Sequence, residues 1–473
     1  EGVCTSLDAA RTYIGIIDST TTTSSAPGAS YAFVDKAILS RTGGYYNTAS
    51  GTAGSSAGTY TSYAVNDVVM IAYQNGKIWF GKNGTWMNSG NPAAGTGAID
   101  TAVSTARTWI PYFGYNSSWA ANFGQRPFAY TPPTGFLPLH TGNLPDSAIV
   151  DGSQYFDVVT RTGTGAEATV TGLQFQPDLL WTKTRSHAVN HSLTSTGLTY
   201  NYSFLQTNTT EPENTSASQY YMIPTADGYT VGTGDNINQV SRTFVDWVWK
   251  ANGAGVSNTD GSITSTVSAN PTSGFSIVTY TGTGANATVG HGLGAAPNVV
   301  IVKNRDSGTI GGAVYHSSLG ATKYLKLFQT TTGTDRDATD NTAWNGGSPT
   351  FDGDVFSVGS LNRTNTNTDQ MLAYCFADVE GYSKFGSYTG NGSTDGTFVY
   401  LGFRPKFVMF KRTNAAGGWI ILDSERSPNN VAQNILSAQA ADADTGSTYN
   451  VVDFLSNGFK LRITGDPNTS GAP

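Results

Sequence analysis

The sequence predicts an all-β protein built from tandem antiparallel β-sandwich domains, and three observations carry this prediction. Only 12% of the 473 residues are charged, whereas an average soluble domain has about 25%. Glycine accounts for 56 residues, which suits tight turns between short strands and disfavours long helices. A strand-rich motif also recurs three times along the chain, and such self-similarity indicates an architecture before any local pattern does.

Each copy of the motif begins at an aromatic residue, reaches a proline 20 to 22 residues later, and has a lysine six residues beyond the proline. Proline lacks a backbone N–H, so it suits the loop that enters a strand. The apolar runs 179–181, 299–302 and 407–410 that follow are therefore predicted to be buried strands. The three sets are Phe156, Pro177 and Lys183; Phe275, Pro297 and Lys303; and Phe385, Pro405 and Lys411.

Two further strands, separated by a glycine turn, are predicted ahead of each proline. Segments 243–249 and 371–377 alternate apolar residues as strands do, and they are predicted to close the first and second repeats. No equivalent segment follows in the third repeat, which is expected to lack its last strand. The copies lie 119 and 110 residues apart, which is the size of a sandwich domain and not of a solenoid turn.

The chain is predicted to divide into one distinct N-terminal domain and the three repeats. Proline-rich turns place the first boundary near residue 145. A stretch rich in Gly, Ser and Thr is expected to be a linker that contributes one strand, residues 262–267. The expected segments are a sandwich at 1–145, the first repeat at 146–252, a linker at 253–271, the second repeat at 272–380 and the third repeat at 381–473.

The N-terminal domain has its own strand pattern. Residues 13–17, 67–73 and 77–80 are apolar or alternating, and the last two flank a Gln-Asn-Gly turn that predicts a hairpin. Residues 42–62 are mostly Gly, Thr, Ser, Ala and Tyr. They are consistent with either a loop or an edge strand.

The composition disfavours several classes of function. The net charge of −7 and the pI near 5.2 argue against nucleic-acid binding, which needs a basic surface. No run of 18 apolar residues exists, so no membrane insertion is expected. Cys4 and Cys375 lie in unlike contexts and do not suggest a disulfide framework.

No catalytic, metal or cofactor site is predicted from the acids and histidines of the sequence. A glycosidase needs two carboxylates that face each other; Asp423 and Glu425 are two residues apart, and a solvated strand end with Arg426 pairing one acid is the preferred interpretation. Two groups of aspartates could supply Ca²⁺ ligands, but they lack an EF-hand spacing and are read as turn residues. These are Asp335, Asp337 and Asp340, and Asp352 and Asp354. His187 and His191 are read as polar surface residues.

Six residues are candidates for ligand binding. The post-proline strand of every repeat ends in cations, which could anchor acidic sugars or could pair with a neighbouring loop; recurrence favours the pairing role. Two tryptophans beside glycine-rich turns could stack on sugar rings or could pack in a core. The six candidates are Lys303, Arg305, Lys411, Arg412, Trp344 and Trp419.

The N-terminal segment resembles a known family. Residues 66–86 (NDVVMIAYQNGKIWFGKNGTW) are similar to the central hairpin of SPRY domains, with a strand, a turn and an Asn-Gly-x-Trp element in order. Residues 121–136 (ANFGQRPFAYTPPTGF) resemble the end of SPRY modules in virion proteins of tailed bacteriophages. The resemblance implies a concanavalin-like or jelly-roll sandwich that binds partners through loops. The early strands of such a domain are expected to be missing before Tyr13, which would make this domain incomplete at its N-terminus.

The repeats resemble modules found behind SPRY-like segments in virion proteins of marine tailed phages. The resemblance rests on WKANGAG at 249–255, GFSIVTYTG at 274–282 and YCFADVEGYSKFGSYTG at 374–390. It implies a non-enzymatic tail-fibre or spike component located on the virion. It also implies an elongated string of sandwiches in a homotrimer, with other virion proteins and a bacterial surface glycan or protein receptor as partners. The alternatives are a polysaccharide-degrading tailspike and a secreted cellular carbohydrate-binding protein.

Overall fold

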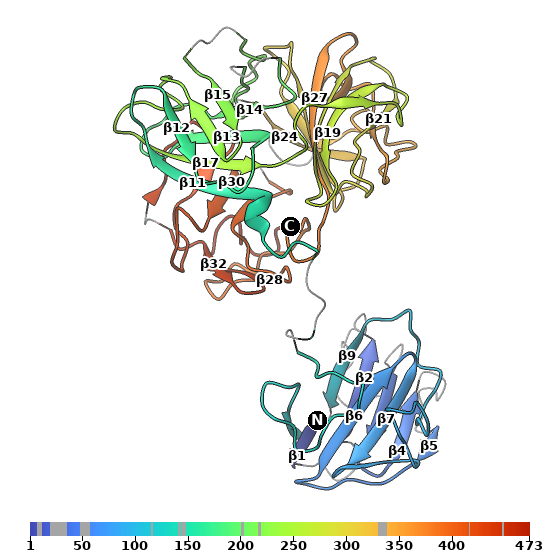
Figure 1. Ribbon diagram of the computed structural model, residues 1–473. Coiled ribbons are helices and arrows are strands. Elements are labelled where there is room, and N and C mark those ends of the chain that lie inside the picture. The colour runs from blue at the N-terminus through green and yellow to red at the C-terminus, as the bar shows by residue number, and fades with distance from the viewer. Residues whose placement is uncertain are drawn as a thin grey trace. The chain divides into compact units, whose positions relative to one another are not determined.

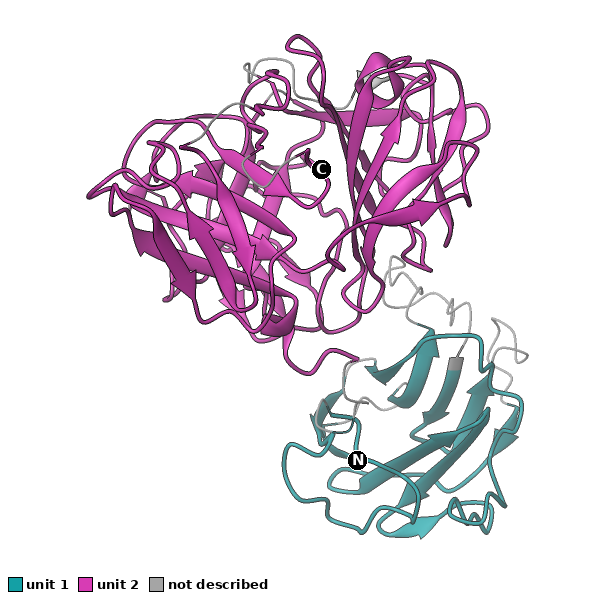
Figure 2. Ribbon diagram, turned by 45° about the horizontal axis from the view of Figure 1, so that its top comes forward, with its two compact units in different colours: residues 1–145 teal, residues 146–473 magenta. Residues whose placement is uncertain are grey.

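The structure is a computed structural model that divides the chain into two compact units, residues 1–145 and 146–473 (Figure 2). The prediction of an all-β fold is confirmed, since the described residues form antiparallel strands, one 3₁₀ turn (Gly152–Gln154) and one short helix, α1 (Asn362–Asn365). Among these residues no helix could cross a membrane. The described residues are 1–6, 12–18, 36–47, 57–114, 117–140, 143, 148–199, 203–215, 219–329, 338–415, 417–446 and 449–473.

The first unit is a sandwich of two five-stranded sheets (Figure 1). Ile14 and Leu39 from one sheet pack with Val69, Ile78 and Phe80 from the other, and this shared burial holds the layers together. One sheet contains β10 (Ser118–Ala121), β1 (Gly2–Ser6), β6 (Val68–Gln74), β7 (Lys77–Lys82) and β8 (Thr85–Trp86) in this order. The other contains β5 (Gly58–Thr59), β4 (Gly44–Asn47), β3 (Lys36–Ser40), β2 (Tyr13–Asp18) and β9 (Trp109–Gly114).

The fold of this unit confirms the predicted hairpin and corrects the expectation about the strands before Tyr13. The predicted hairpin is β6–β7, and Asn75 and Gly76 in its turn both have positive φ, 48° and 76°, as a twisted two-residue turn requires. Part of the segment 42–62 forms the edge strands β4 and β5, and residues 48–56 lie outside the described residues. A strand does precede Tyr13, because β1 pairs with β10 and β6; the expectation that no early strand is present was wrong.

The second unit contains the three repeats, and each repeat has an inner sheet and an outer sheet. In the first repeat the inner sheet is β11 (Phe156–Thr162), β17 (Thr243–Trp249), β13 (Leu179–Thr184) and β14 (Ser192–Ser195). Its outer sheet is β12 (Ala168–Thr171), β16 (Gly228–Val231) and β15 (Met222–Thr225).

The second repeat has the largest inner sheet, and the third has the smallest. The inner sheet of the second repeat contains, in order, β18 (Val256–Asn258), β19 (Ser265–Asn270), β20 (Phe275–Thr281), β27 (Gln370–Phe376), β22 (Val299–Asn304), β23 (Gly312–His316), β24 (Lys323–Leu327) and β25 (Ala338–Thr339). Its outer sheet is the pair β21 (Ala287–Gly290) and β26 (Val355–Val358).

The inner sheet of the third repeat contains, in order, β29 (Phe407–Lys411), β30 (Trp419–Asp423) and β31 (Leu436–Ser437). Its outer sheet contains β28 (Phe398–Tyr400), β33 (Gly458–Leu461) and β32 (Val452–Leu455).

The post-proline strands β13, β22 and β29 pack against a core on each face; β13 is buried throughout, whereas Phe407 and Met409 of β29 are partly buried. In β13, Leu179 and Trp181 point into a core that all three repeats share, whereas Leu180 points into the core of its own repeat. The other two strands alternate in the same way. This double burial explains why these segments are continuous apolar runs and do not alternate with polar residues.

The shared core joins the repeats into one body, which corrects the expectation of a string of separate sandwiches. Phe407 of the third repeat lies 5.8 to 6.0 Å, between ring centroids, from Phe156, Trp247 and Trp249 of the first. Trp249 in turn contacts Phe376 of the second repeat at 6.5 Å. Aromatic rings at these distances and tilts pack favourably, so the three inner sheets stabilise one another.

The segment expected to be a linker, residues 253–271, instead belongs to the second repeat. Within it, β18 pairs with β19, and β19 pairs along its whole length with β20. Val267 of β19 is buried in the core of the second repeat. Strand β18 is therefore the edge of the sheet, and β19 is an internal strand although its sequence is rich in small residues.

The third repeat differs from the others beside β29. Strands β13 and β22 pair on one side with β17 and β27, but β29 has a strand partner only in β30 among the described residues. The Thr413 N–H donates to the Pro473 carbonyl at 3.2 Å, as the N–H groups of Arg185 and Arg305 donate to the first residues of β17 and β27. Pro473 thus takes the position that Thr243 and Gln370 hold in the first and second repeats.

Candidate functional site

The two candidate tryptophans are core residues. Trp344 is 0% exposed and meets Tyr315 and Phe351 edge-on in the core of the second repeat. Trp419 is 7% exposed, and its indole N–H donates to the Lys326 carbonyl at 2.9 Å, across the boundary between the third and second repeats. Of the two interpretations left open, core packing therefore holds for both tryptophans, Trp344 in the core of the second repeat and Trp419 in the core that the repeats share.

Lys303 and Arg305 are also buried, at the boundary between the second and first repeats. The Lys303 ammonium donates to the Thr210 carbonyl at 2.8 Å, and burial lowers its pKa from 10.5 to about 8. Arg305 Nε donates to a Glu213 carboxylate oxygen at 2.6 Å, and Nη2 donates to Thr199 Oγ1 at 2.7 Å. These two cations therefore pair with a neighbouring repeat, which was the favoured structural interpretation.

Lys411 and Arg412 remain half-buried within the third repeat. The Lys411 ammonium donates to the Arg412 carbonyl at 2.7 Å. Arg412 pairs with Asp466 at 3.1 Å and donates to Asn414 at 2.7 Å. Of the six candidates these two alone keep partial access to solvent, and both are held by local partners.

Asp423 and Glu425, the two acids nearest to a glycosidase pair in the sequence, lie in different environments. Asp423 is buried; it accepts from Arg426 Nε at 2.6 Å and from the Trp247 indole N–H at 3.0 Å. Glu425 is exposed and pairs with Lys406 at 3.3 Å. The expectation of a solvated Asp423–Arg426 pair was wrong, because the first repeat covers it.

An ion network joins the first and third repeats around this pair. Arg426 also pairs with Asp444 at 2.7 Å, and Asp444 pairs with Arg185 of the first repeat at 2.7 Å. Nearby, His191 is fully buried and not on the surface; its Nδ1 accepts from the Trp181 indole, and its Nε2 lies 3.0 Å from the Ser437 carbonyl. The interpretation of His191 as a polar surface residue was wrong, because the third repeat covers it.

These contacts all run in one direction around the three repeats. Arg305 of the second repeat reaches the first, Arg185 of the first reaches the third, and Trp419 of the third reaches the second. A head-to-tail interface that returns to its starting point closes a ring. The three repeats thus form a closed ring, in which each repeat contacts the other two.

No metal centre emerges from the described part of the chain, where no group of three or more His, Cys, Asp or Glu converges. Asp352 accepts from the N–H groups of Asp354 and Val355 at 2.9 Å each, as a turn residue does. Asp335 and Asp337 lie outside the described residues.

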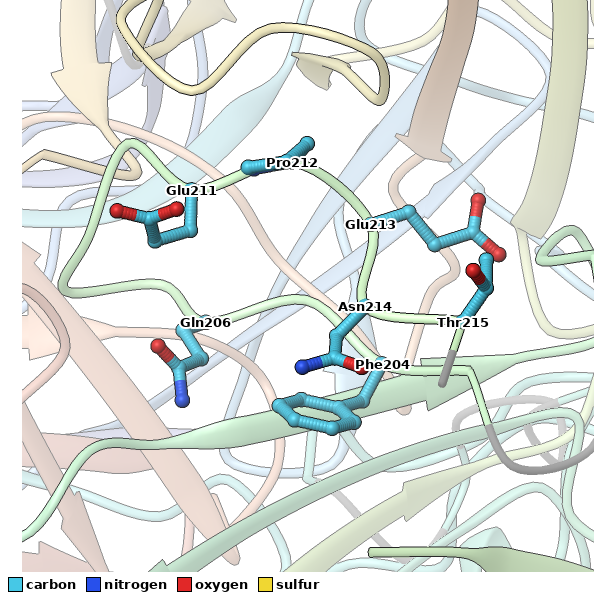
Figure 3. Close-up of a pocket in the computed structure, with 7 residues that line it drawn as sticks. All are labelled: Phe204, Gln206, Glu211, Pro212, Glu213, Asn214 and Thr215. Atoms are coloured by element: carbon cyan, nitrogen blue, oxygen red, sulfur yellow. The ribbon is translucent and has the colours of Figure 1, made fainter. Parts of the chain in front are cut away.

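A shallow pocket of about 280 Å³ lies on the first repeat (Figure 3). Its walls combine one aromatic ring with amide and carboxylate groups. Glu213 points away from Glu211 and Gln206 in Figure 3, and its carboxylate is engaged by Arg305. The Glu213 carboxylate is therefore not available to a ligand in the pocket. The residues that line it are Phe204, Gln206, Glu211, Pro212, Glu213, Asn214 and Thr215.

A different surface, on the outer sheet of the third repeat, presents large exposed aromatic residues. Phe398 and Tyr400 of β28 are 44% and 64% exposed, while Val399 between them packs on the core of the repeat. Phe398 lies opposite Lys460 of β33, and Tyr400 lies opposite Gly458. Because side chains alternate along a strand, Phe398, Tyr400 and Lys460 share the outward face.

Charged residues surround the two rings. Lys460 pairs with Asp395 at 2.5 Å, and the hydrogen bond and positive charge of its ammonium lower the pKa of the Asp395 carboxyl. Arg462, two residues along the same face, pairs with Asp453 at 2.6 Å and lies 3.8 Å from Asp395. We call Asp395, Phe398, Tyr400, Lys460 and Arg462 the third-repeat face.

The other two repeats provide an internal comparison for this face. By register, the place of Phe398 is taken by threonine in both other repeats, Thr169 and Thr288, and that of Tyr400 by Thr171 and Gly290. The position of Lys460 is Thr230 in the first repeat and Ser357 in the second. The fold therefore does not require aromatic residues here.

The sequence reasoning did not single out the third-repeat face. The sequence does contain an indication of this face. Aligning the repeats on their glycine turns and prolines places Phe398 and Tyr400 where the other two repeats have threonine or glycine. Aromatic residues also favour strands, however, so the pattern alone fits an ordinary edge strand.

Comparison with known proteins gives one result. The sequence model of a family described as "Domain of unknown function (DUF7483)" matches residues 151–473, which cover nearly all of the three-repeat unit. No curated protein and no solved structure matches the chain.

Proposed function

The chain belongs to the DUF7483 family, and we propose that it is a non-enzymatic virion protein of a tailed bacteriophage, a tail-fibre or spike component that attaches the particle to the host surface. The sequence resemblance to SPRY-like and repeat modules of phage virion proteins motivates the virion assignment. The observation that carries attachment is the third-repeat face, where aromatic rings are exposed although the same fold is built twice without them.

The closed ring supports this role physically. Binding costs less conformational entropy when the binding groups stand on a rigid body. The third-repeat face stands on a sandwich that shares its inner core with two others and is tied to them by buried ion pairs. Partners in this proposal are other virion proteins, further copies of the chain in a trimer, and a bacterial glycan or protein receptor.

The acid pair offers little support for the alternative of a polysaccharide-degrading tailspike. Such an enzyme needs an acid and a base that face the same bond. Asp423 is already occupied by Arg426 and Trp247, while Glu425 points to solvent with Lys406. These environments favour a structural role for Asp423.

Immunogold electron microscopy of purified particles tests the proposal, with binding of the purified chain to host cells as a second readout. We expect labelling of the tail or its fibres and saturable binding to the cells. A chain absent from every particle would favour the secreted carbohydrate-binding protein. Release of oligosaccharides from host surface glycans by the purified chain would favour the tailspike.

A further inference from the structure

We propose that the third-repeat face binds an uncharged saccharide, whose rings stack on Phe398 and Tyr400 and whose hydroxyls hydrogen-bond to Asp395, Lys460 and Arg462. The inference deepens the proposed attachment function, and its biological role rests on that function.

The two rings form a short platform on an exposed strand. Residues two apart on one strand lie about 7 Å apart on the same face. Strand β28 is the edge of its three-stranded sheet, and no residue of the described chain covers the outward face of either ring enough to bury it. Flat apolar ring faces with polar groups beside them suit the C–H faces and hydroxyls of a sugar ring.

The first and second repeats show that the fold does not need aromatic residues at the positions of Phe398 and Tyr400. Thr169 and Thr171 stand in the equivalent strand β12, which pairs with β16 in the same register as β28 pairs with β33. In that repeat, Thr169 Oγ1 lies 3.1 Å from Thr230 Oγ1, so small hydroxyl residues satisfy the sheet. The fold therefore does not require Phe398 and Tyr400, and two neighbouring exposed aromatic residues with polar groups beside them are typical of a binding surface.

The charges on the face favour a neutral ligand over an acidic one. Both cations are paired, Lys460 with Asp395 and Arg462 with Asp453, so no unpaired positive charge is offered to an anion. The side chains of Lys460 and Arg462 are nevertheless 28% and 34% exposed. Neighbouring donors and acceptors of this kind match the hydroxyl groups of a polyol, each of which both donates and accepts.

The test uses the full chain and isothermal titration calorimetry with named probes. The neutral probes are maltohexaose, cellohexaose and mannohexaose, and the acidic comparison is an alginate hexamer. The test variant is the double substitution Phe398→Thr and Tyr400→Thr, which introduces the residues that the first repeat already carries in this position. The matched control is Tyr449→Thr, at another exposed tyrosine of the third repeat that is 49% exposed.

We expect at least one neutral probe to bind, and the double variant to lose about tenfold or more in affinity because two stacking contacts are removed. Tyr449→Thr should bind as the wild type does, and Tyr400→Phe should retain binding because it keeps the ring. Equal melting temperatures of wild type and variants will show that the fold is intact.

Three results would overturn the inference: no neutral probe binds, only the alginate hexamer binds, or the double variant binds as well as the wild type. A loss of self-association in the double variant by analytical ultracentrifugation, without saccharide binding, would instead identify the face as a contact between copies. Failure here is distinguishable from failure of the proposed function. A chain that binds a neutral saccharide but is absent from particles refutes only the virion role, whereas cell attachment that survives the double substitution refutes only this site.

Discussion

At the scale of single residues, burial decides the role of four polar groups that the sequence analysis considered as site or surface residues. Lys303, Arg305, Asp423 and His191 all read as surface residues by type, yet each is buried and makes hydrogen bonds to a neighbouring repeat. A buried polar group is costly unless it is paired. These residues therefore fix the relative positions of the repeats.

His191 predicts acid sensitivity. Burial lowers its pKa from 6.5 to about 3, and the nearby Lys183 and Arg426 charges act in the same direction. Because the folded pKa lies below the unfolded one, the unfolded state binds the extra proton, so stability is full above about pH 6.5 and falls as the pH drops toward 3. Within this window, each drop of one pH unit lowers the free energy of unfolding by up to about 1.4 kcal/mol.

Urea unfolding of the wild type and of His191→Gln at pH 7 and pH 5 measures this effect. We expect the wild type to lose about 1–2 kcal/mol more than the variant between these pH values. Equal losses in the two proteins would mean that His191 does not titrate as its burial predicts.

Glu213 gives a second residue-scale prediction. Its carboxylate and the Arg305 guanidinium are 5% and 9% exposed, so Glu213→Ala leaves a buried cation without its partner. We expect a loss of about 3–5 kcal/mol in the free energy of unfolding, measured by chemical denaturation. The control Glu425→Ala breaks the exposed pair with Lys406 and should cost at most about 1 kcal/mol. Similar losses in both variants would contradict the structural role of Glu213.

At the scale of elements, one asparagine in each repeat holds the turn after the first strand against the outer sheet. In the second repeat, the Asn365 amide donates to Thr283 Oγ1 and to the carbonyls of Ala285 and Gly359, at 2.6 to 3.1 Å. Asn238 and Asn468 make matching contacts in the first and third repeats. The equivalence shows that the repeats share local hydrogen bonding as well as strand order.

Replacing Asn365 by alanine should destabilise the second repeat. The change leaves three acceptors and the Thr283 N–H, which donates to Asn365 Oδ1 at 2.7 Å, without their partner in a buried site. We expect a loss of about 2–4 kcal/mol by chemical denaturation. Asn367→Ala, at an exposed position two residues on, should be close to neutral; a comparable loss there would argue that the turn and not the buried amide sets the stability.

At the scale of the whole molecule, the sequence allowed the fold class, the repeats and the post-proline strands to be predicted, but not their assembly. The spacing of prolines and lysines reports local strand order, and β13, β22 and β29 are indeed strands in similar environments. A run such as Leu179 to Trp181 shows that both faces are covered without showing what covers them. The shared core, and with it the burial of Trp419 and Arg305, depends on contacts between residues far apart in sequence.

The central claim is that the three repeats form one closed body, and hydrogen-exchange mass spectrometry of the full chain tests it most directly. Glu213→Ala acts at the boundary between the first and second repeats alone. If the ring is closed, the backbone amides of β11, β20 and β29 should all exchange faster in this variant than in the wild type. Strand β29 is the decisive one, because it does not contact the altered residue. Faster exchange confined to the first and second repeats, with β29 unchanged, would contradict the account.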